Sequence, residues 1–242
     1  MSHQMTLIPI KLVDEPPADK SLGRDIKYLG TDEQGLRYAL KTVEPETPLL
    51  PLTEWLCYNL CALAGIYAPD YFIVTRLDGT LAFASRWVEG TFNFSPGKNS
   101  EAQLMTWLAE CSDDLGNMFA IDATLPNQDR NFGNVLFQHT ATRLRALAID
   151  WSRAQIFEPW PWPNDCISKQ NWGWISSNNL ANMGAVHSKM NRLKAISAEQ
   201  IKQILEAAPI EWRQNFDVDA AAEFWEQIRD NRIEAALKLL GD

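Results

Sequence analysis

The sequence has few of the residues that bind transition metals or form disulfide frameworks. Only four cysteines and three histidines occur among its 242 residues, and no two cysteines form a C-x-x-C pair. Cys57 and Cys61 lie four residues apart in a helical pattern, so they would share one helix face as small apolar residues. This interpretation is favoured over a metal site or a disulfide bond, which stay as alternatives.

The sequence also lacks an excess of basic charge and any long apolar run. Its 31 acidic and 22 basic residues give a net charge of −9. Nonspecific nucleic-acid binding needs an excess of Lys and Arg to neutralise phosphates, so direct binding of nucleic acid is not expected. A local basic patch stays as an alternative. No apolar run approaches the roughly 18 residues that suggest a membrane span, and no signal sequence is evident. We therefore expect a cytoplasmic protein without membrane contact.

Residues 1–90 are predicted to form a β-rich N-terminal lobe. Apolar residues that alternate with polar ones are typical of half-buried strands. In one such stretch Leu36, Tyr38 and Leu40 would face a core, and Lys41 would lie on the opposite face. Strands are expected at residues 6–13, 25–29, 35–43, 70–75 and 81–87.

One helix is predicted within this lobe. Thr53 is expected to cap it and Gly65 to end it. Glu54 would then lie in the first turn, where an acidic side chain favours the helix dipole. The alternative is an ion pair with Lys41, which would hold the lysine on the phosphates of a nucleotide.

Residues 91–242 are predicted to form a mainly helical C-terminal lobe, after a polar connection at residues 89–99. Apolar residues recur there at three- and four-residue spacing, which is typical of helices. A Trp- and Pro-rich segment at residues 151–174 is interpreted as a packed surface lid, with a docking site as the alternative. Helices are expected at residues 101–123, 178–193, 197–208 and 219–240.

The stretch that carries the chemistry runs from residue 129 to residue 150. Asp129 begins the pattern D-R-x-x-x-N, which ends at Asn134; a hairpin follows, and its second strand ends on Asp150. This layout is typical of a kinase catalytic loop followed by a metal-binding aspartate. Asp129 would accept or orient the proton of a substrate hydroxyl, while Asn134 and Asp150 would bind Mg²⁺ through hard oxygen atoms. The alternatives are a turn role for Asp129 and a strand-end cap for Asp150.

A nucleotide would need two further contacts. The sequence has no complete G-x-G-x-x-G loop, so Ser21 and Gly23 are the best candidates to offer backbone N–H groups to phosphates. Adenine would bond to the backbone at the end of the last N-terminal strand. The residues expected to bind it are Ser85, Trp87 and Val88.

In the order of these features the chain resembles the HipA-like kinases, in particular the short members of that family. The matching stretches are residues 35–43 with Lys41, residues 53–69 with Glu54, and residues 127–154. The resemblance implies an α+β, two-lobed protein-kinase-like fold, with a small antiparallel N-lobe and a mainly helical C-lobe. It also implies ATP and Mg²⁺ as cofactors and a Ser or Thr hydroxyl of a protein as the acceptor.

The resemblance leaves partner and activity open. Some family members are toxins of toxin–antitoxin pairs, which makes a small antitoxin a candidate partner. Two residues depart from the family pattern: Asn131 stands where many relatives have His, and Trp151-Ser152 where many have His-Gly. We expect an active Ser/Thr kinase; the alternatives are a nucleotide-binding pseudokinase, an interaction module without nucleotide, and a kinase of small molecules.

Overall fold

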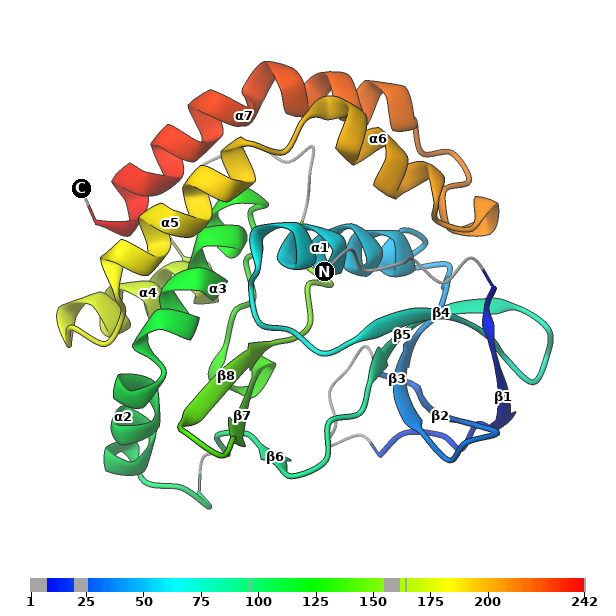
Figure 1. Cartoon of the computed structure of the whole chain (residues 1–242), viewed down its shortest axis with the longest axis horizontal. Coiled ribbons are helices and arrows are strands. Elements are labelled where there is room, and N and C mark those ends of the chain that lie inside the picture. Colours follow the sequence, from blue (N-terminus) through cyan, green and yellow to red (C-terminus); the bar gives the residue numbers. More distant parts are fainter. Residues whose placement is uncertain (1–7, 20–25, 96, 155–161, 164, 242) are drawn as a thin grey trace.

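The computed structural model describes residues 8–19, 26–95, 97–154, 162–163 and 165–241 (Figure 1). The predicted phosphate-loop residues Ser21 and Gly23 lie outside these ranges. In the described part, no helix is both long enough and apolar enough to cross a membrane.

Five strands form a closed barrel instead of the expected antiparallel sheet. The barrel closes because the first strand also pairs in parallel with the fourth, at Ile10–Val74 and Lys11–Thr75. Tyr38 and Leu40 point into its core and are each only 1% exposed, as the alternation predicts. Around the barrel the strands follow the order β1 (Ile10–Asp14), β2 (Tyr28–Asp32), β3 (Arg37–Lys41), β5 (Leu81–Arg86) and β4 (Tyr71–Thr75).

The first helix, α1 (Leu50–Ala64), is capped by Leu49 and so begins four residues earlier than predicted. Pro51 is tolerated in its first turn because the N–H groups there have no partner within the helix. Thr53 is already inside the helix, since its N–H donates to the carbonyl of Leu49 at 2.8 Å. Glu54 therefore lies beyond the first turn, and its assignment to the helix dipole is wrong. Gly65 ends the helix with φ 69°, as predicted.

Three further strands follow the barrel, and the hairpin between residues 134 and 150 is confirmed. The expected single helix over residues 101–123 is broken at Cys111, whose φ of −104° and ψ of 20° are not helical. A second helix begins at Ser112, and Asp113 and Asp114 lie in its first turn, where acidic charge favours the helix dipole. The elements are β6 (Thr91–Phe92), α2 (Glu101–Glu110), α3 (Ser112–Thr124), β7 (Val135–His139) and β8 (Leu144–Ala148).

The Trp-rich segment is part of the interior where it is described, so its assignment to a surface lid is wrong there. Trp151, Trp162 and Trp172 are at most 4% exposed. The indole N–H of Trp162 donates to the carbonyl of Asp122 at 3.0 Å. That of Trp172 donates to the carbonyl of Leu240 at 3.0 Å. Residues 155–161 of the segment lie outside the described ranges.

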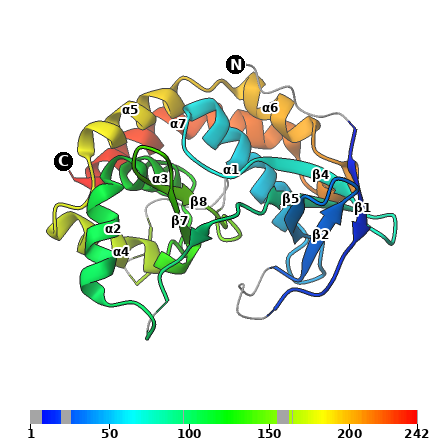
Figure 2. The same ribbon diagram turned by 60° about the horizontal axis from the view of Figure 1, so that its bottom comes forward.

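Four helices follow in the C-terminal part of the chain, α4 (Ile167–Ser177), α5 (Met183–Lys194), α6 (Ala198–Glu206) and α7 (Val218–Leu240). Two of them, α5 and α6, pack on α1. A capping box of Ser197 and Gln200 begins α6, one residue into the range predicted for a helix. Figures 1 and 2 show α1 lying between the barrel and these C-terminal helices. Trp55 of α1 donates its indole N–H to the carbonyl of Ile204 at 2.7 Å.

Candidate nucleotide site

A cavity of about 210 Å³ lies between the barrel and the β7–β8 hairpin. Its walls come from β3, α1, the end of β5, and the segments on both sides of β7 and β8. Apolar side chains such as Ala39, Leu136 and Ile149 line it beside charged ones. Of the residues predicted from the sequence, it is lined by Lys41, Glu54, Ser85, Trp87, Val88, Asn134 and Asp150.

Lys41 is the charged centre of this cavity. It is the last residue of β3, and strand alternation turns its side chain away from the barrel core that holds Leu40. There it lines the cavity and is only 5% exposed. Its ammonium lies 2.9 Å from Oδ1 of Asp150 and 3.4 Å from Oε1 of Glu54. The structure thus brings together three residues that lie far apart in the sequence.

Glu54 and Asp150 differ in their electrostatic environment. Burial raises the pKa of Glu54 to about 7, against the influence of the Lys41 ammonium. Burial would also raise the pKa of Asp150, but the attraction and hydrogen bond of Lys41 lower it to about 2. Asp150 is therefore the more strongly ionised partner of Lys41.

The backbone around Asp150 holds its carboxylate in place. Asp150 has φ 61°, a left-handed conformation that Asp adopts more readily than most residues. The N–H of Trp151 donates to Oε1 of Glu54 at 3.1 Å, and the N–H of Ser152 donates to Asp150 itself at 3.4 Å. The Trp151 ring is fully buried and packs edge-on against Tyr58 at 4.9 Å between centroids. Its bulk is thus accommodated in the core.

Asp129 lies on the segment next to the cavity and does not line it. The side chain of Asn131 donates to Oδ1 of Asp129 at 3.2 Å. The side chain of Asn134 donates to the carbonyl of Asp129 at 2.9 Å. Asn131, the departure from the family pattern, thus orients the carboxylate predicted to face the substrate.

Asn134 and Asp150 fit a magnesium ion bound together with a nucleotide. The side-chain oxygen of Asn134 accepts no hydrogen bond from any described residue, because the amide bonds through its nitrogen. Asp150 adds a carboxylate, and both residues line the same cavity. Among the described residues no group of three or more His, Cys, Asp or Glu could hold a metal. Phosphates and water would supply the remaining ligands, as is usual for Mg²⁺.

The strand end where adenine is expected offers one free donor. The N–H groups of Arg86 and Trp87 already donate to the carbonyls of Asp70 and Arg37, at 2.7 and 2.8 Å. The N–H of Val88 has no acceptor among the described residues. Of the backbone N–H groups of Arg86, Trp87 and Val88, that of Val88 is therefore the best placed to bond adenine, and the contacts expected of Ser85 and Trp87 stay predictions.

The sequence-based prediction missed Arg130, which lies between Asp129 and Asn131. Its side chain is 1% exposed and forms a two-point ion pair with Asp122 of α3. It also donates to the carbonyls of Asn134 and Ile149. The one available signal was Asp122, an acidic residue inside the apolar run of residues 118–125, which would need a buried cationic partner.

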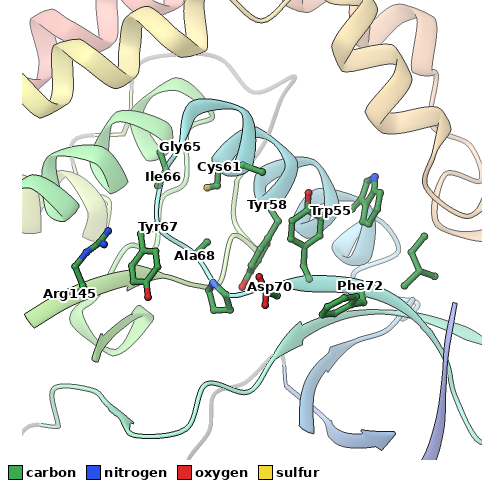
Figure 3. A pocket seen from close by; sticks show the side chains of 14 residues that line it. Trp55, Tyr58, Cys61, Gly65, Ile66, Tyr67, Ala68, Asp70, Phe72 and Arg145 are labelled. Carbon is green, nitrogen blue, oxygen red and sulfur yellow. The ribbon is translucent and has the colours of Figure 1, made fainter. Parts of the chain in front are cut away.

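A larger cavity of about 470 Å³ lies on another side of α1 (Figure 3). Tyr58 and Pro69 line both cavities and separate them. Figure 3 shows Tyr67 and Arg145 together at one end, away from Trp55 and Phe72. None of the predicted site residues lines this cavity, so we place the chemistry in the smaller one.

No protein-family model matches the chain, and no curated protein matches its sequence. Solved structures match its fold. The crystal structure of the proinflammatory kinase CtkA from Helicobacter pylori aligns with a TM-score of 0.58 at 13% identity, over 96% of each chain. The N-terminal 618-residue fragment of LepB from Legionella pneumophila aligns with a TM-score of 0.54 at 11% identity, over 86% of this chain and 46% of the other.

The toxin HipA of Shewanella oneidensis MR-1, solved with HipB and operator DNA, aligns with a TM-score of 0.45 at 13% identity. That alignment spans 96% of this chain and 66% of the HipA chain. At such identities a match concerns the fold alone. Because the CtkA alignment spans nearly all of both chains, the chain has a mixed α/β fold like that of this kinase, and this part of the expected fold is confirmed.

The raised pKa of Glu54 predicts a pH dependence of stability. Its folded pKa lies above its unfolded value, so the native state binds the proton more tightly and loses stability as pH rises from about 4.5 to about 7. Glu54→Gln removes this loss. The unfolding free energy of the variant relative to wild type should therefore rise by roughly 2–3 kcal/mol between pH 4.5 and pH 7.5, measured by urea denaturation. A pH-independent difference would contradict the assignment.

Proposed function

We propose that the protein is an ATP- and Mg²⁺-dependent kinase that transfers the γ-phosphoryl group to a Ser or Thr hydroxyl of a protein. The observation that carries this proposal is the contact of Lys41 with both Glu54 and Asp150 in a cavity that Asn134 also lines. We divide the chain into an N-terminal lobe at residues 1–90 and a helical C-terminal lobe at residues 91–242. The kinase fold supports the class of reaction, and the site residues support the roles below.

Phosphoryl transfer depends mainly on positioning and on neutralising charge. Lys41 would bind the phosphates nearest the nucleoside, and Glu54 would keep its ammonium in the cavity. Asn134 and Asp150 would hold Mg²⁺, which supplies positive charge between the phosphates when bound. The oxygen of the acceptor hydroxyl would bond to the γ-phosphorus while ADP departs. Asp129 would accept the proton that this hydroxyl loses.

A pseudokinase is the second candidate, and a specific observation favours it. Asp150 is bound to Lys41 at 2.9 Å, so a nucleotide must separate two groups that already neutralise each other.

Two further parts of the proposal rest on the sequence alone. Ser21 and Gly23 would bind the phosphates of the nucleotide through their backbone N–H groups. A small antitoxin partner rests only on the resemblance to HipA-like kinases.

Asp129→Asn should abolish turnover and preserve nucleotide binding, because Asp129 lies outside the cavity that would hold ATP. With labelled ATP, Mg²⁺ and a cell lysate, we expect wild type to label protein and the variant to lose at least about 100-fold in rate. Asp219→Asn, on the exposed side of α7, is the matched control and should label normally. Equal labelling by Asp129→Asn would exclude its catalytic role; Mg-ATP binding by wild type without any turnover would favour the pseudokinase.

Val88→Pro tests the adenine contact, because proline has no backbone N–H. We expect the dissociation constant for ATP to rise about fivefold to tenfold, the value of one hydrogen bond of about 1–1.5 kcal/mol. Val88→Ala keeps the N–H and should bind ATP nearly as wild type does. Isothermal titration calorimetry measures both. Similar affinities for the two variants would place adenine elsewhere.

A further inference from the structure

We infer that Arg130 is a positioning residue that sets the separation of the two magnesium ligands, Asn134 and Asp150, an inference that rests on the proposed function. Arg130 touches neither cavity. It acts through the backbone of the two segments that carry the ligands.

The guanidinium of Arg130 joins these segments directly. Its Nη1 donates to the carbonyl of Asn134 at 2.8 Å and to the carbonyl of Ile149, the residue before Asp150. One nitrogen atom therefore ties together one ligand residue and the immediate neighbour of the other. In the sequence these two carbonyls lie fifteen positions apart, one just before β7 and the other just after β8.

The rest of the guanidinium is held rigid from α3. Nε donates to Oδ2 of Asp122 at 2.7 Å, and Nη2 donates to Oδ1 of Asp122 at 3.0 Å. The central carbon of the guanidinium, Cζ, lies over the ring of Trp151, 5.2 Å from its centroid. Such a two-point pair fixes orientation as well as distance, which a lysine at this position could not do.

The backbone of Arg130 is anchored as firmly as its side chain. Its N–H donates to the hydroxyl of Ser168 at 2.7 Å, and its carbonyl accepts from the side chain of Asn171 at 2.8 Å. Both partners belong to α4. Arg130 thus transmits the position of two helices, α3 and α4, to the hairpin ends that carry the metal ligands.

Magnesium makes such control necessary. It requires nearly ideal octahedral geometry at 2.0–2.1 Å, whereas Ca²⁺ accepts flexible geometry at longer distances. Partners that orient metal ligands are typically worth 10–100-fold in metal affinity. Loss of the guanidinium of Arg130 should therefore weaken ATP binding in the presence of Mg²⁺ more than in the presence of Ca²⁺.

The test compares Arg130→Lys with Arg145→Lys. Arg145 forms the same two-point pair with Asp114, at 2.8 and 2.9 Å, but contacts neither Asn134 nor the backbone before Asp150. ATP affinity is measured by calorimetry for wild type and both variants in EDTA, in Mg²⁺ and in Ca²⁺. In EDTA, we expect Arg130→Lys to bind ATP as tightly as wild type does. The factor by which Mg²⁺ raises ATP affinity should be at least tenfold smaller in Arg130→Lys than in wild type. The factor by which Ca²⁺ raises it should be less than threefold smaller. Arg145→Lys should match wild type in all three.

Equal losses with both cations, or the same loss in Arg145→Lys, would overturn the positioning role, because a general loss of structure does not distinguish cations. If Arg130→Lys does not fold, Asp122→Asn is tested in its place. This variant keeps the shape of the side chain that binds Arg130 and removes its negative charge. Amide hydrogen exchange without ligand provides a separate readout, and we expect faster exchange at residues 134–136 and 149–152 in Arg130→Lys alone. Wild type that binds no Mg-ATP would reject the proposed function, whereas unchanged exchange in Arg130→Lys would reject the role of Arg130.

Discussion

The structure depends on one buried cation, Lys41, held between two carboxylates that come from distant parts of the chain. Burying an ammonium is costly unless it is paired, and here Asp150 and Glu54 lie at 2.9 and 3.4 Å. Asp150 supplies the stronger counter-charge, because its pKa is lowered to about 2 whereas burial raises that of Glu54 to about 7. The contact therefore links the position of the barrel to that of α1 and of the β7–β8 hairpin, and it defines where a nucleotide phosphate would bind.

The position of α1 is in turn determined by the C-terminal helices. Trp55 bonds to the backbone of α6, and Lys189 of α5 donates to the carbonyl of Gly65 at 2.7 Å, where α1 ends. A cation at the C-terminal end of a helix also favours the helix dipole. The second turn and the C-terminal end of α1 are thereby attached to the same group of helices, which keeps Glu54 beside Lys41 and beside the N–H of Trp151.

The local pattern of the sequence was enough to predict the barrel strands, the hairpin and the residues that meet around Lys41. It placed the start of α1 at Thr53 because a capping residue is a stronger signal than Pro51, although proline is tolerated in a first turn. The role of Arg130 could not be predicted, since its partners are a side chain on α3 and two backbone carbonyls that only the folded chain brings together. The burial of the described Trp residues depends equally on long-range packing.

The central claim is that Lys41 binds the phosphates of a nucleotide in the cavity between the barrel and the hairpin. The most direct test is the dissociation constant of Mg-ATP for wild type, for Lys41→Met and for Lys238→Met, a variant of an exposed lysine on α7. We predict that Lys41→Met weakens binding by at least about tenfold, since it removes a charge-assisted contact worth about 1.5–3 kcal/mol, and that Lys238→Met binds as wild type does. Equal affinities for all three proteins, or no binding by wild type, would contradict the account.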